Sequence, residues 1–387
     1  MKKIGLVTFF QGNFGSILQC YATKCAIEKE GFECEILFQT DNISIKNVSW
    51  ISPKLNNAIR LAKNCISDPT YFHRWMRYRK NRGGLTDETH HLMDNFVENY
   101  IRPQGYSWDE LCELAKSDEY VAFVVGSDQV WNFNNETSKI YGLEFAPREK
   151  RIALSVSLGV EKANNRFLEL LKHNLSLFDR ISVREETAMK IISKIGDFEI
   201  YRLSDPTILL EKKDWESIIG TEQNSEDEYL LVHFLNYPSD LAIRTINKQQ
   251  KLKQARVLCI GYYYDIFDCM GWEYVDCNPF DYVRYINNAV SIYTDSFHTT
   301  LFSINFNKSF AVFERMYTHG YPQTSRINNL LNIYDKSKCF IRSENVEIQD
   351  VNDNREILSF ERAKIKKYLI ESISRRGKSY EGKNLFS

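Results

Sequence analysis

Short apolar runs, each followed by small polar residues and then by a helical pattern, constrain the fold of this chain most strongly. The first run is KIGLVTFF at residues 3–10; the turn QGNFGS and a helix with an apolar stripe starting at Leu18 follow it. A second strand pattern spans residues 33–38. Such a strand-helix-strand unit ordinarily folds as a right-handed parallel crossover. The opening of the chain therefore predicts a parallel sheet covered by helices.

The same alternation continues in two further series. The expected strands of the first series span residues 121–125, 152–157 and 180–183, and those of the second span residues 229–235, 255–260, 290–293 and 311–313. Strands that alternate with helices are typical of α/β domains. We therefore expect two doubly wound α/β domains that meet near residues 202–206.

Changes in amino-acid composition divide the chain further. Residues 42–118 are polar, aromatic and basic, with a Gly83-Gly84 break, and they predict a mostly helical insertion. We expect a first domain over residues 1–200 that carries this insertion and a second domain over residues 201–358. Residues 359–387 are expected to form a C-terminal helix and tail, and the helix would pack back on the first domain.

Charge and hydropathy exclude several classes of protein. The 387 residues carry a formal net charge of -1, which leaves no overall basic surface for a nucleic acid. No stretch approaches the ~20 apolar residues of a membrane-spanning helix. Polar Gln11 and Asn13 interrupt the first apolar run before a secretory signal could be complete. The nine cysteines include no CxxC pair, which favours reduced thiols in a cytoplasmic protein over a metal site.

In open α/β sheets, ligands bind beyond the carboxyl ends of the strands, so the residues that follow each apolar run are the candidates for a site. Asn13 and Gly15 follow the first strand, where glycine permits a tight turn and the helix N-terminus offers N–H groups to an anion. Ser127, Asp128 and Gln129 follow the strand at 121–125 and suit a sugar hydroxyl. Ordinary turns and helix caps explain the same residues.

Arg184 comes directly after the strand at 180–183. A planar guanidinium binds a carboxylate or phosphate at two points, so an arginine at this edge of a sheet indicates an anion site. A salt bridge to the neighbouring Glu185 or Glu186 is the alternative.

The segment SIYTDSFHTTLFSINFNKSFAVF, residues 291–313, holds the densest group of candidates. Asp295 and Ser296 are expected to cap a helix whose first turn carries His298 and Thr299. A histidine there suits a general base or a phosphate ligand. We also expect Lys308, before the next strand, and Arg326, in a polar turn further on, to lie beside it.

These motifs resemble the polysaccharide pyruvyltransferase family. The matching series, which runs from about residue 4 to about residue 333, is GNFG at 12–15 with Gln19, VGSDQVWN at 125–132, VRE at 183–185, DPT at 205–207, TDSFH at 294–298 and SRI at 325–327. GSDQVWN and TDSFH are the specific motifs. One departure is Thr299, because the family usually has glycine after this histidine.

The resemblance implies two Rossmann-like domains that face one another across a cleft, as in GT-B glycosyltransferases. It also implies transfer of the pyruvyl group of phosphoenolpyruvate to two sugar hydroxyls, giving a cyclic ketal and phosphate, with no cofactor or metal. We expect Arg184, Lys308 and Arg326 to bind the donor and His298 to transfer a proton. Asp295 would orient the histidine or cap its helix.

In the same scheme Asn13, Gly15, Gln19, Ser127, Asp128, Gln129, Ser296 and Thr299 complete the substrate site. The acceptor would be a sugar of a polysaccharide or of its lipid-linked precursor, and the protein would work in the cytoplasm, at the inner face of the membrane. The basic aromatic stretch around Arg74 and Trp75 suits peripheral membrane contact, although a solvated helix face explains it too.

Two other functions fit the same frame, because a fold does not fix a function. One is a nucleotide-sugar glycosyltransferase, for which UDP or GDP sugars, and not phosphoenolpyruvate, would raise the melting temperature. The other is a non-catalytic sugar-binding protein, which the many polar strand ends disfavour.

Overall fold

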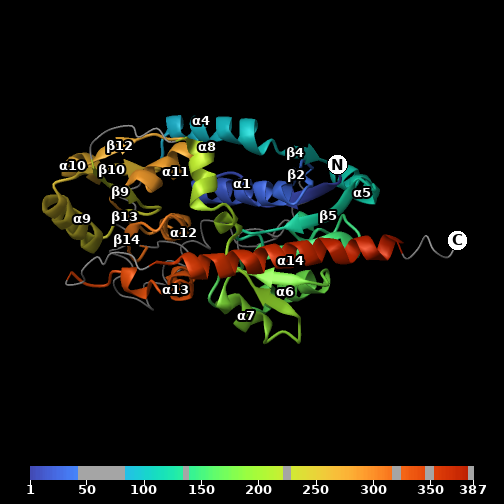
Figure 1. Cartoon of the computed structure of the whole chain (residues 1–387). Helices are drawn as coiled ribbons and strands as arrows, with labels where there is room; N and C mark the ends of the chain where they lie inside the picture. The colour runs from blue at the N-terminus through green and yellow to red at the C-terminus, as the bar shows by residue number, and fades with distance from the viewer. Residues whose placement is uncertain (42–82, 134–138, 221–227, 316–323, 345–352, 382–387) are drawn as a thin grey trace, which may run out of the picture.

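Two parallel sheets, one in each half of the chain, form the framework of this computed structural model (Figure 1). The structure describes residues 1–41, 83–133, 139–220, 228–315, 324–344 and 353–381. Residues 42–82 of the expected insertion, with Arg74 and Trp75, lie outside the described residues.

The first sheet has seven strands in the described part of the chain, in the order β4-β2-β1-β5-β6-β7-β8. Its strands are β1 (Lys3–Val7), β2 (Glu33–Gln39), β4 (Gln104–Tyr106), β5 (Tyr120–Val125), β6 (Arg151–Val156), β7 (Ile181–Val183) and β8 (Ile200–Arg202). Every neighbouring pair is parallel. The central strands are buried on both faces, which explains why they read as continuous apolar runs.

The second sheet has five parallel strands among the described residues, in the order β12-β10-β9-β13-β14. These strands are β9 (Tyr229–His233), β10 (Arg256–Ile260), β12 (Glu273–Val275), β13 (Ser291–Thr294) and β14 (Ser309–Val312). The two sheets are separate, as the two series of strand patterns predict, and the α/β class is confirmed.

Helices connect and cover both sheets. In the first half they are α1 (Phe14–Lys29), α4 (Asp87–Phe96) with a π-helical end at Val97–Ile101, α5 (Trp108–Lys116), α6 (Asn165–Ser176) and α7 (Glu186–Ile192). In the second half they are α8 (Lys212–Ile219), α9 (Asp240–Lys253), α10 (Ile266–Met270), α11 (Pro279–Asn288), α12 (Phe297–Asn305), α13 (Thr324–Ile333) and α14 (Arg355–Glu381). Short 3-10 turns lie at Lys139–Gly142, Arg148–Lys150, Pro206–Leu209 and Ser337–Cys339.

One of the hydrophobic clusters runs through both domains. Leu6 and Phe14 of the first domain belong to the same buried cluster as Leu301 and Phe302 of the second domain. Phe14 also stacks on Tyr282 of α11, with ring centroids 4.6 Å apart and nearly parallel planes. The start of α1 is therefore packed directly against the second domain.

The described part of the insertion reaches across to the second domain. Strand β3 (Gly84–Leu85) pairs antiparallel with β11 (Tyr262–Tyr263), and α4 lies over the second sheet's outer helices in Figure 1. Asp276 accepts hydrogen bonds from the hydroxyls of Thr86 and Thr89. Helices α4 and α5 agree with the expected helical insertion, but β4 joins the first sheet, so the end of this segment is part of the sheet.

Helix α14 spans the molecule from α13 past β5 (Figure 1). The hydroxyl of Tyr368 donates to the carbonyl of Ala153 in β6, at 2.9 Å. Glu361 is buried and pairs with Arg202 at 2.6 Å. The helix thus packs along the first domain. Of the helices that the structure describes, none combines the length and the apolar character needed to cross a membrane.

Candidate active site

The carboxyl ends of adjacent strands in the first sheet bring several polar side chains together. Ser127 and Asp128 follow β5, Ser157 follows β6, and Arg184 and Glu185 follow β7. These residues are all buried although they are polar. Because β5, β6 and β7 are neighbours in the sheet, their ends form one continuous polar edge.

Arg184 occupies the centre of this edge, and its side chain is 2% exposed. Its Nη1 donates to Asp205, and its Nε lies 3.4 Å from Oε1 of Glu185. Burial lowers the pKa of Arg184, but the two carboxylates and Asp128 more than offset it, so the pKa is raised. One nitrogen of the buried guanidinium, Nη2, has no hydrogen-bond partner among the described residues.

Asp205 links both domains within this network. Its Oδ2 accepts from the hydroxyl of Ser127 at 2.9 Å and lies 3.6 Å from Nε2 of His298. Its Oδ1 accepts from the backbone N–H of Thr207 at 2.9 Å. Burial raises the pKa of Asp205, but the interaction with His298 and the charge of Arg184 lower it far more, so its pKa lies well below the usual range. Asp205 is ionised at neutral pH.

His298 enters from the second domain, in the first turn of α12, which Ser296 caps. The residue is 8% exposed. Its ring lies against Gly15 at the start of α1, where an added Cβ would come within 2.1 Å of Nδ1. No described group forms a hydrogen bond with its Nε2, and Asp205 lies at ion-pair distance. Glycine at position 15 therefore allows helix α1 and the histidine to meet.

Asp128 completes the first-domain side. Its Oδ2 accepts from the hydroxyl of Ser16 at 2.6 Å, and its Oδ1 accepts from the backbone N–H of Gln129 at 2.8 Å. Burial raises the pKa of Asp128, but the charges of His298 and Arg184 outweigh burial and lower it. Asp128 thus lies in the electrostatic field of the same cluster.

Arg326, in the first turn of α13, closes the cluster from the second domain. Its Nε lies 3.3 Å from Oε1 of Glu185, and its guanidinium lies 5.1 Å from the ring centroid of Phe297. Arg184 lies 4.4 Å from the same ring. Phe297 therefore packs against both cations, an arrangement that cation–π attraction stabilises.

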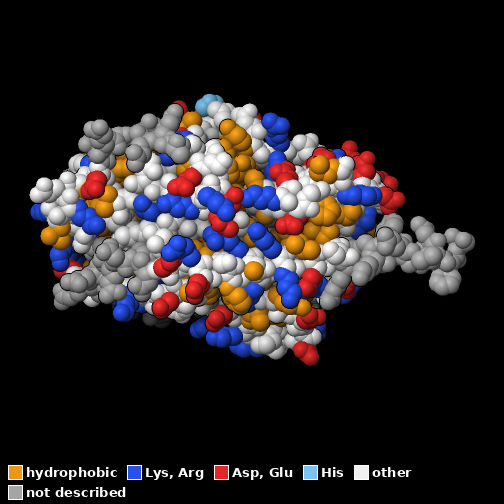
Figure 2. Space-filling model, in the orientation of Figure 1, with side chains coloured by type: hydrophobic (Ala, Val, Ile, Leu, Met, Phe, Trp, Pro, Cys, Tyr) orange, Lys and Arg blue, Asp and Glu red, His pale blue; other side chains and the backbone are white. Residues whose placement is uncertain are grey.

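We call Asp128, Arg184, Glu185, Asp205, His298 and Arg326 the interdomain cluster. Its three carboxylates and two guanidiniums leave one net negative charge when the imidazole is neutral and none when it is protonated. On the face shown in Figure 2, acidic and basic side chains are interspersed.

Lys308 was expected beside the histidine, and this expectation is wrong. Its Nζ donates to the carbonyl of Asn287 at 2.9 Å. Lys308 precedes β14, so it lies at the amino edge of the sheet, whereas His298 follows the carboxyl end of β13. Burial, with a contribution from Lys212, lowers the pKa of Lys308 to about 8. Lys308 therefore stabilises the fold of the second domain and is not part of the site around His298.

Asp295 was expected to orient His298 or to cap its helix, and it does neither. Its carboxylate accepts the backbone N–H groups of Leu235 and Asn236, at 2.7 and 3.1 Å, and lies 3.4 Å from Nε of Arg315. Burial raises the pKa of Asp295, although Arg315 opposes this effect. The carboxylate fixes the loop after β9, and Asp205 takes the place beside the imidazole.

Thr299 turns toward the core of the second domain. Its hydroxyl lies 2.6 Å from that of Tyr282, and its backbone N–H donates to Ser296 at 3.4 Å. Ser296 therefore acts as the helix cap.

Three further expected residues, Asn13, Gln19 and Gln129, form hydrogen bonds within the first domain. Asn13 caps α1 and accepts from Ser16 N–H at 2.9 Å. Gln19 donates to the hydroxyl of Thr8 and the carbonyl of Phe9, and its oxygen accepts from Ser127 N–H at 3.2 Å. The side-chain oxygen of Gln129 accepts from Asn132 at 3.0 Å. Gln19 thus holds the segment that carries Asp128.

Sequence reasoning missed Asp205 and missed Glu185 as more than a salt-bridge partner of Arg184. Asp205 follows β8, a strand of three half-buried residues with no apolar periodicity. The DPT motif at 205–207 was the available signal. Glu185 lies next to Arg184, and only the fold shows that Arg326 reaches it from the other domain.

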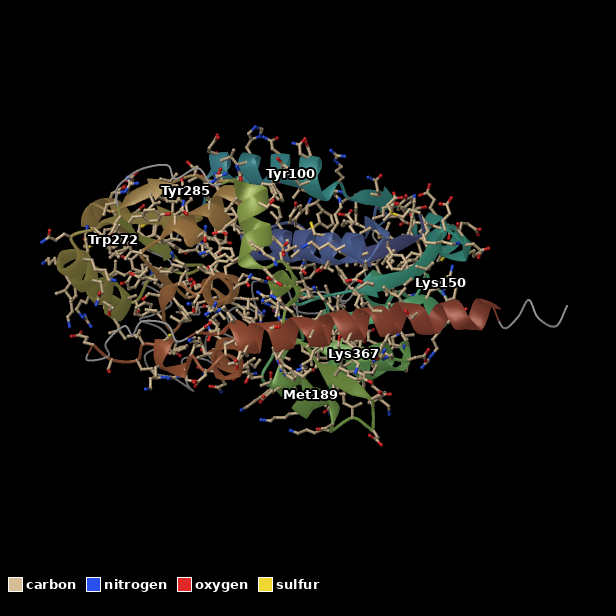
Figure 3. All side chains as sticks on the ribbon, in the orientation of Figure 1. Tyr100, Lys150, Met189, Trp272, Tyr285 and Lys367 are labelled. Atoms are coloured by element: carbon tan, nitrogen blue, oxygen red, sulfur yellow. The ribbon has the colours of Figure 1, made fainter. Side chains whose placement is uncertain are left out.

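A shallow hollow on the outer edge of the first domain is separate from this cluster. Met189, Phe198 and Ile200 line it, and Figure 3 shows Met189 near the outer end of that domain. Within the described ranges, no group of three or more His, Cys, Asp or Glu side chains is arranged to hold a metal ion.

Comparison with known families and structures shows which proteins this chain resembles. A family model described as polysaccharide pyruvyl transferase matches residues 13–315, more than half of the chain. The matched span includes five of the six cluster residues and stops short of Arg326. No curated protein matched the sequence.

Solved structures with a similar fold share little sequence. The MnaA protein of S. aureus in a UDP co-structure is 11% identical with a TM-score of 0.50, over 97% of this chain and 98% of that chain. A UDP-GlcNAc 2-epimerase from Neisseria meningitidis is 10% identical with a TM-score of 0.48, over 96% and 100% of the two chains. UGT71G1 from Medicago truncatula is 10% identical with a TM-score of 0.40, over 96% and 93%. The likeness to MnaA concerns the fold alone, which is of the GT-B type.

Proposed function

The chain belongs to the polysaccharide pyruvyl transferase family, and on this premise we propose that it transfers the pyruvyl group of phosphoenolpyruvate to two hydroxyls of a sugar. The products are a cyclic pyruvate ketal and phosphate. The acceptor is a sugar of a polysaccharide or of its lipid-linked precursor. No cofactor takes part in this scheme.

One observation supports this proposal most. Arg184 and His298 come from different domains, both contact Asp205, and each keeps a buried nitrogen without a hydrogen-bond partner among the described residues. A buried donor without a partner costs free energy, so a ligand with acceptor oxygens stabilises it. A small anion is a ligand of that kind.

Phosphoenolpyruvate fits the chemistry of the two open nitrogens. Its carboxylate or phosphate offers planar or tetrahedral oxygens to the guanidinium of Arg184. The cluster is neutral when His298 is protonated, so an anionic donor binds best to that form. The proton on His298 is then available to the reaction.

In the proposed reaction the methylene carbon of the donor gains a proton, and the central carbon becomes oxocarbenium-like. Protonated His298 gives its proton to the methylene carbon, and the neutral imidazole then accepts the proton of the sugar hydroxyl that attacks the central carbon. Asp205 acts as a positioning residue, because it holds the imidazole and the guanidinium in one geometry. Asp128 lies at the same edge and would bind a hydroxyl of the acceptor.

The test is a direct assay. The purified protein is incubated with phosphoenolpyruvate and with lipid-linked or aryl glycosides, and phosphate and product masses are measured. We expect phosphate release together with a pyruvate mass gain on the acceptor.

A thermal-shift comparison separates this function from glycosyl transfer on the same frame. Phosphoenolpyruvate should raise the melting temperature, and UDP or GDP sugars should not. A shift with nucleotide sugars alone, with no phosphate released in the assay, would overturn the proposal.

A further inference from the structure

Glu185 carries a feature that the proposed reaction has not yet used. Its side chain is 3% exposed. Oε1 accepts from the hydroxyl of Ser157 and lies 3.4 Å from Nε of Arg184 and 3.3 Å from Nε of Arg326. Oε2 is buried and has no hydrogen-bond partner within the described parts of the chain. A carboxylate oxygen accepts hydrogen bonds only, so its natural ligand is a hydroxyl or another donor.

The three unpartnered atoms, Nη2 of Arg184, Nε2 of His298 and Oε2 of Glu185, belong to residues that are linked through the guanidinium of Arg184. Nη1 of Arg184 donates to Asp205, which lies 3.6 Å from Nε2 of His298; Nε of Arg184 lies 3.4 Å from Glu185, and Nη2 has no hydrogen-bond partner among the described residues. His298 and Glu185 therefore flank Arg184 on different edges. A ligand that binds Nη2 thus binds the nitrogen of Arg184 that neither Asp205 nor Glu185 occupies. This arrangement suits a donor anion and a hydroxyl-bearing acceptor held together.

Ketal formation releases two hydroxyl protons in succession. Two hydroxyl oxygens bond to the central carbon of the donor, and each gives up a proton. The π pair of the donor takes one proton at the methylene carbon. The bond from the central carbon to the phosphate oxygen breaks, the electron pair leaves with phosphate, and phosphate takes the other proton. Phosphoenolpyruvate and a diol thus give a ketal and hydrogen phosphate, with atoms and charge balanced.

We propose that Glu185 is the second proton acceptor: Oε2 binds the second sugar hydroxyl and removes its proton as the ketal closes and phosphate leaves. This inference rests on the proposed function, in which His298 serves the first hydroxyl. A carboxylate suits the second step because the attacked carbon is then oxocarbenium-like. Inverting glycosidases use a carboxylate in the same way to activate water against such a carbon. Ser157 and the two arginines hold Glu185 in place for this task.

Isotope exchange in heavy water separates the two steps. In the first step the methylene carbon takes a proton from His298, which exchanges its proton with solvent, and reversal of that step leaves deuterium in recovered phosphoenolpyruvate. We expect Glu185→Gln to lower the rate of ketal formation by ~10²-fold or more while the recovered donor still gains deuterium in the presence of acceptor. His298→Ala should lose both signals. Ketal is measured by mass spectrometry and deuterium by NMR of the donor.

Glu186→Gln is the matched control, because Glu186 is the exposed neighbour in the chain, and it should keep both signals. Glu185→Asp keeps a negative charge beside both arginines, so it serves if Glu185→Gln does not fold. It should also close the ketal slowly and retain exchange, because its oxygens lie one methylene further back.

Two results would overturn the role of Glu185. One is ketal formation by Glu185→Gln within about threefold of the wild-type rate. The other is loss of exchange and ketal together in folded Glu185→Gln and Glu185→Asp, which would indicate a structural role. If the wild-type protein forms no ketal from phosphoenolpyruvate, the proposed function itself fails, and that result is seen before any variant is made.

Discussion

The guanidinium of Arg184 contacts Asp205 and Glu185 and keeps Nη2 for a ligand. Replacement by lysine keeps the charge and loses the planar set of donors. One charge-assisted hydrogen bond contributes about 1.5–3 kcal/mol. We therefore expect Arg184→Lys to raise the KM for phosphoenolpyruvate by roughly 10- to 100-fold. Steady-state phosphate release measures this change.

Lys308→Gln is the control for this prediction. Lys308 is a cation too, but it lies in the second domain and donates to the carbonyl of Asn287 at the amino edge of the second sheet, away from the cluster. It should leave the KM for the donor unchanged. An equal effect of both substitutions would mean that total charge, and not the geometry of Arg184, determines donor binding.

His233 gives a pH-dependent prediction. It is buried with its ring edge-to-face against Phe14 and Tyr282, and its Nδ1–H donates to the carbonyl of Ile260 at 3.0 Å. Burial, with the charge of Arg315, lowers its pKa from 6.5 to about 4. Between pH 6.5 and pH 4, His233 is therefore protonated in the unfolded chain and neutral in the folded protein. The free energy of unfolding should fall as pH drops from 6.5 to 4, by about 1.4 kcal/mol per pH unit from this group.

Urea unfolding at pH 6.5 and 5 tests the role of His233. We expect His233→Asn to be less stable than wild type at pH 6.5 and to show a smaller loss between the two pH values. His173→Gln is the control, because this histidine is 54% exposed, and it should keep the wild-type slope. An unchanged slope in His233→Asn would contradict the assignment.

At the scale of elements, β3 and β11 tie the first domain to the second. A Cβ at Gly83 would lie 2.2 Å from the carbonyl oxygen of Tyr263, whereas one at Gly84 meets nothing within 4 Å. We expect Gly83→Ala to break this pairing and to speed amide exchange in β11 by about tenfold or more, which corresponds to ~1.4 kcal/mol. Gly84→Ala should leave exchange nearly unchanged. Equal protection in both variants would show that the pairing tolerates the clash.

Ligands of open α/β sheets bind beyond the carboxyl ends of the strands, and this rule explains what could be predicted of the site. It applies to Asp128, Arg184 and His298, which follow β5, β7 and β13, and all three lie in one cluster. It does not apply to Lys308, which precedes a strand. Asp295 follows β13 too, but the two N–H groups after β9 bind its carboxylate, and no sequence pattern reveals a contact of that kind.

The same limits apply to the fold. Long apolar runs such as β5 and β9 could be located within one or two residues, because both faces are buried. The short strands β4 and β8 at opposite edges of the first sheet are partly exposed, so they lack that signal. Asp205 follows β8 and was therefore missed as a site residue.

At the scale of the whole molecule, one buried cluster runs through both domains and into α14. It joins Leu6 of β1, Phe302 of α12 and Tyr368 of α14. Interfaces between domains that move are usually smaller and more polar. We therefore expect a single calorimetric transition in which the calorimetric and van't Hoff enthalpies agree. Two resolved transitions would show that the domains unfold independently.

The central claim is that the interdomain cluster is the site of pyruvyl transfer, and the kinetics of His298→Ala test it most directly. Turnover and donor KM are measured from phosphate release, with the melting temperature as the check on folding. The account predicts that kcat at saturating phosphoenolpyruvate falls by ~10²–10⁴-fold while the melting temperature changes little. A folded variant with near-normal kcat at saturating phosphoenolpyruvate would contradict it.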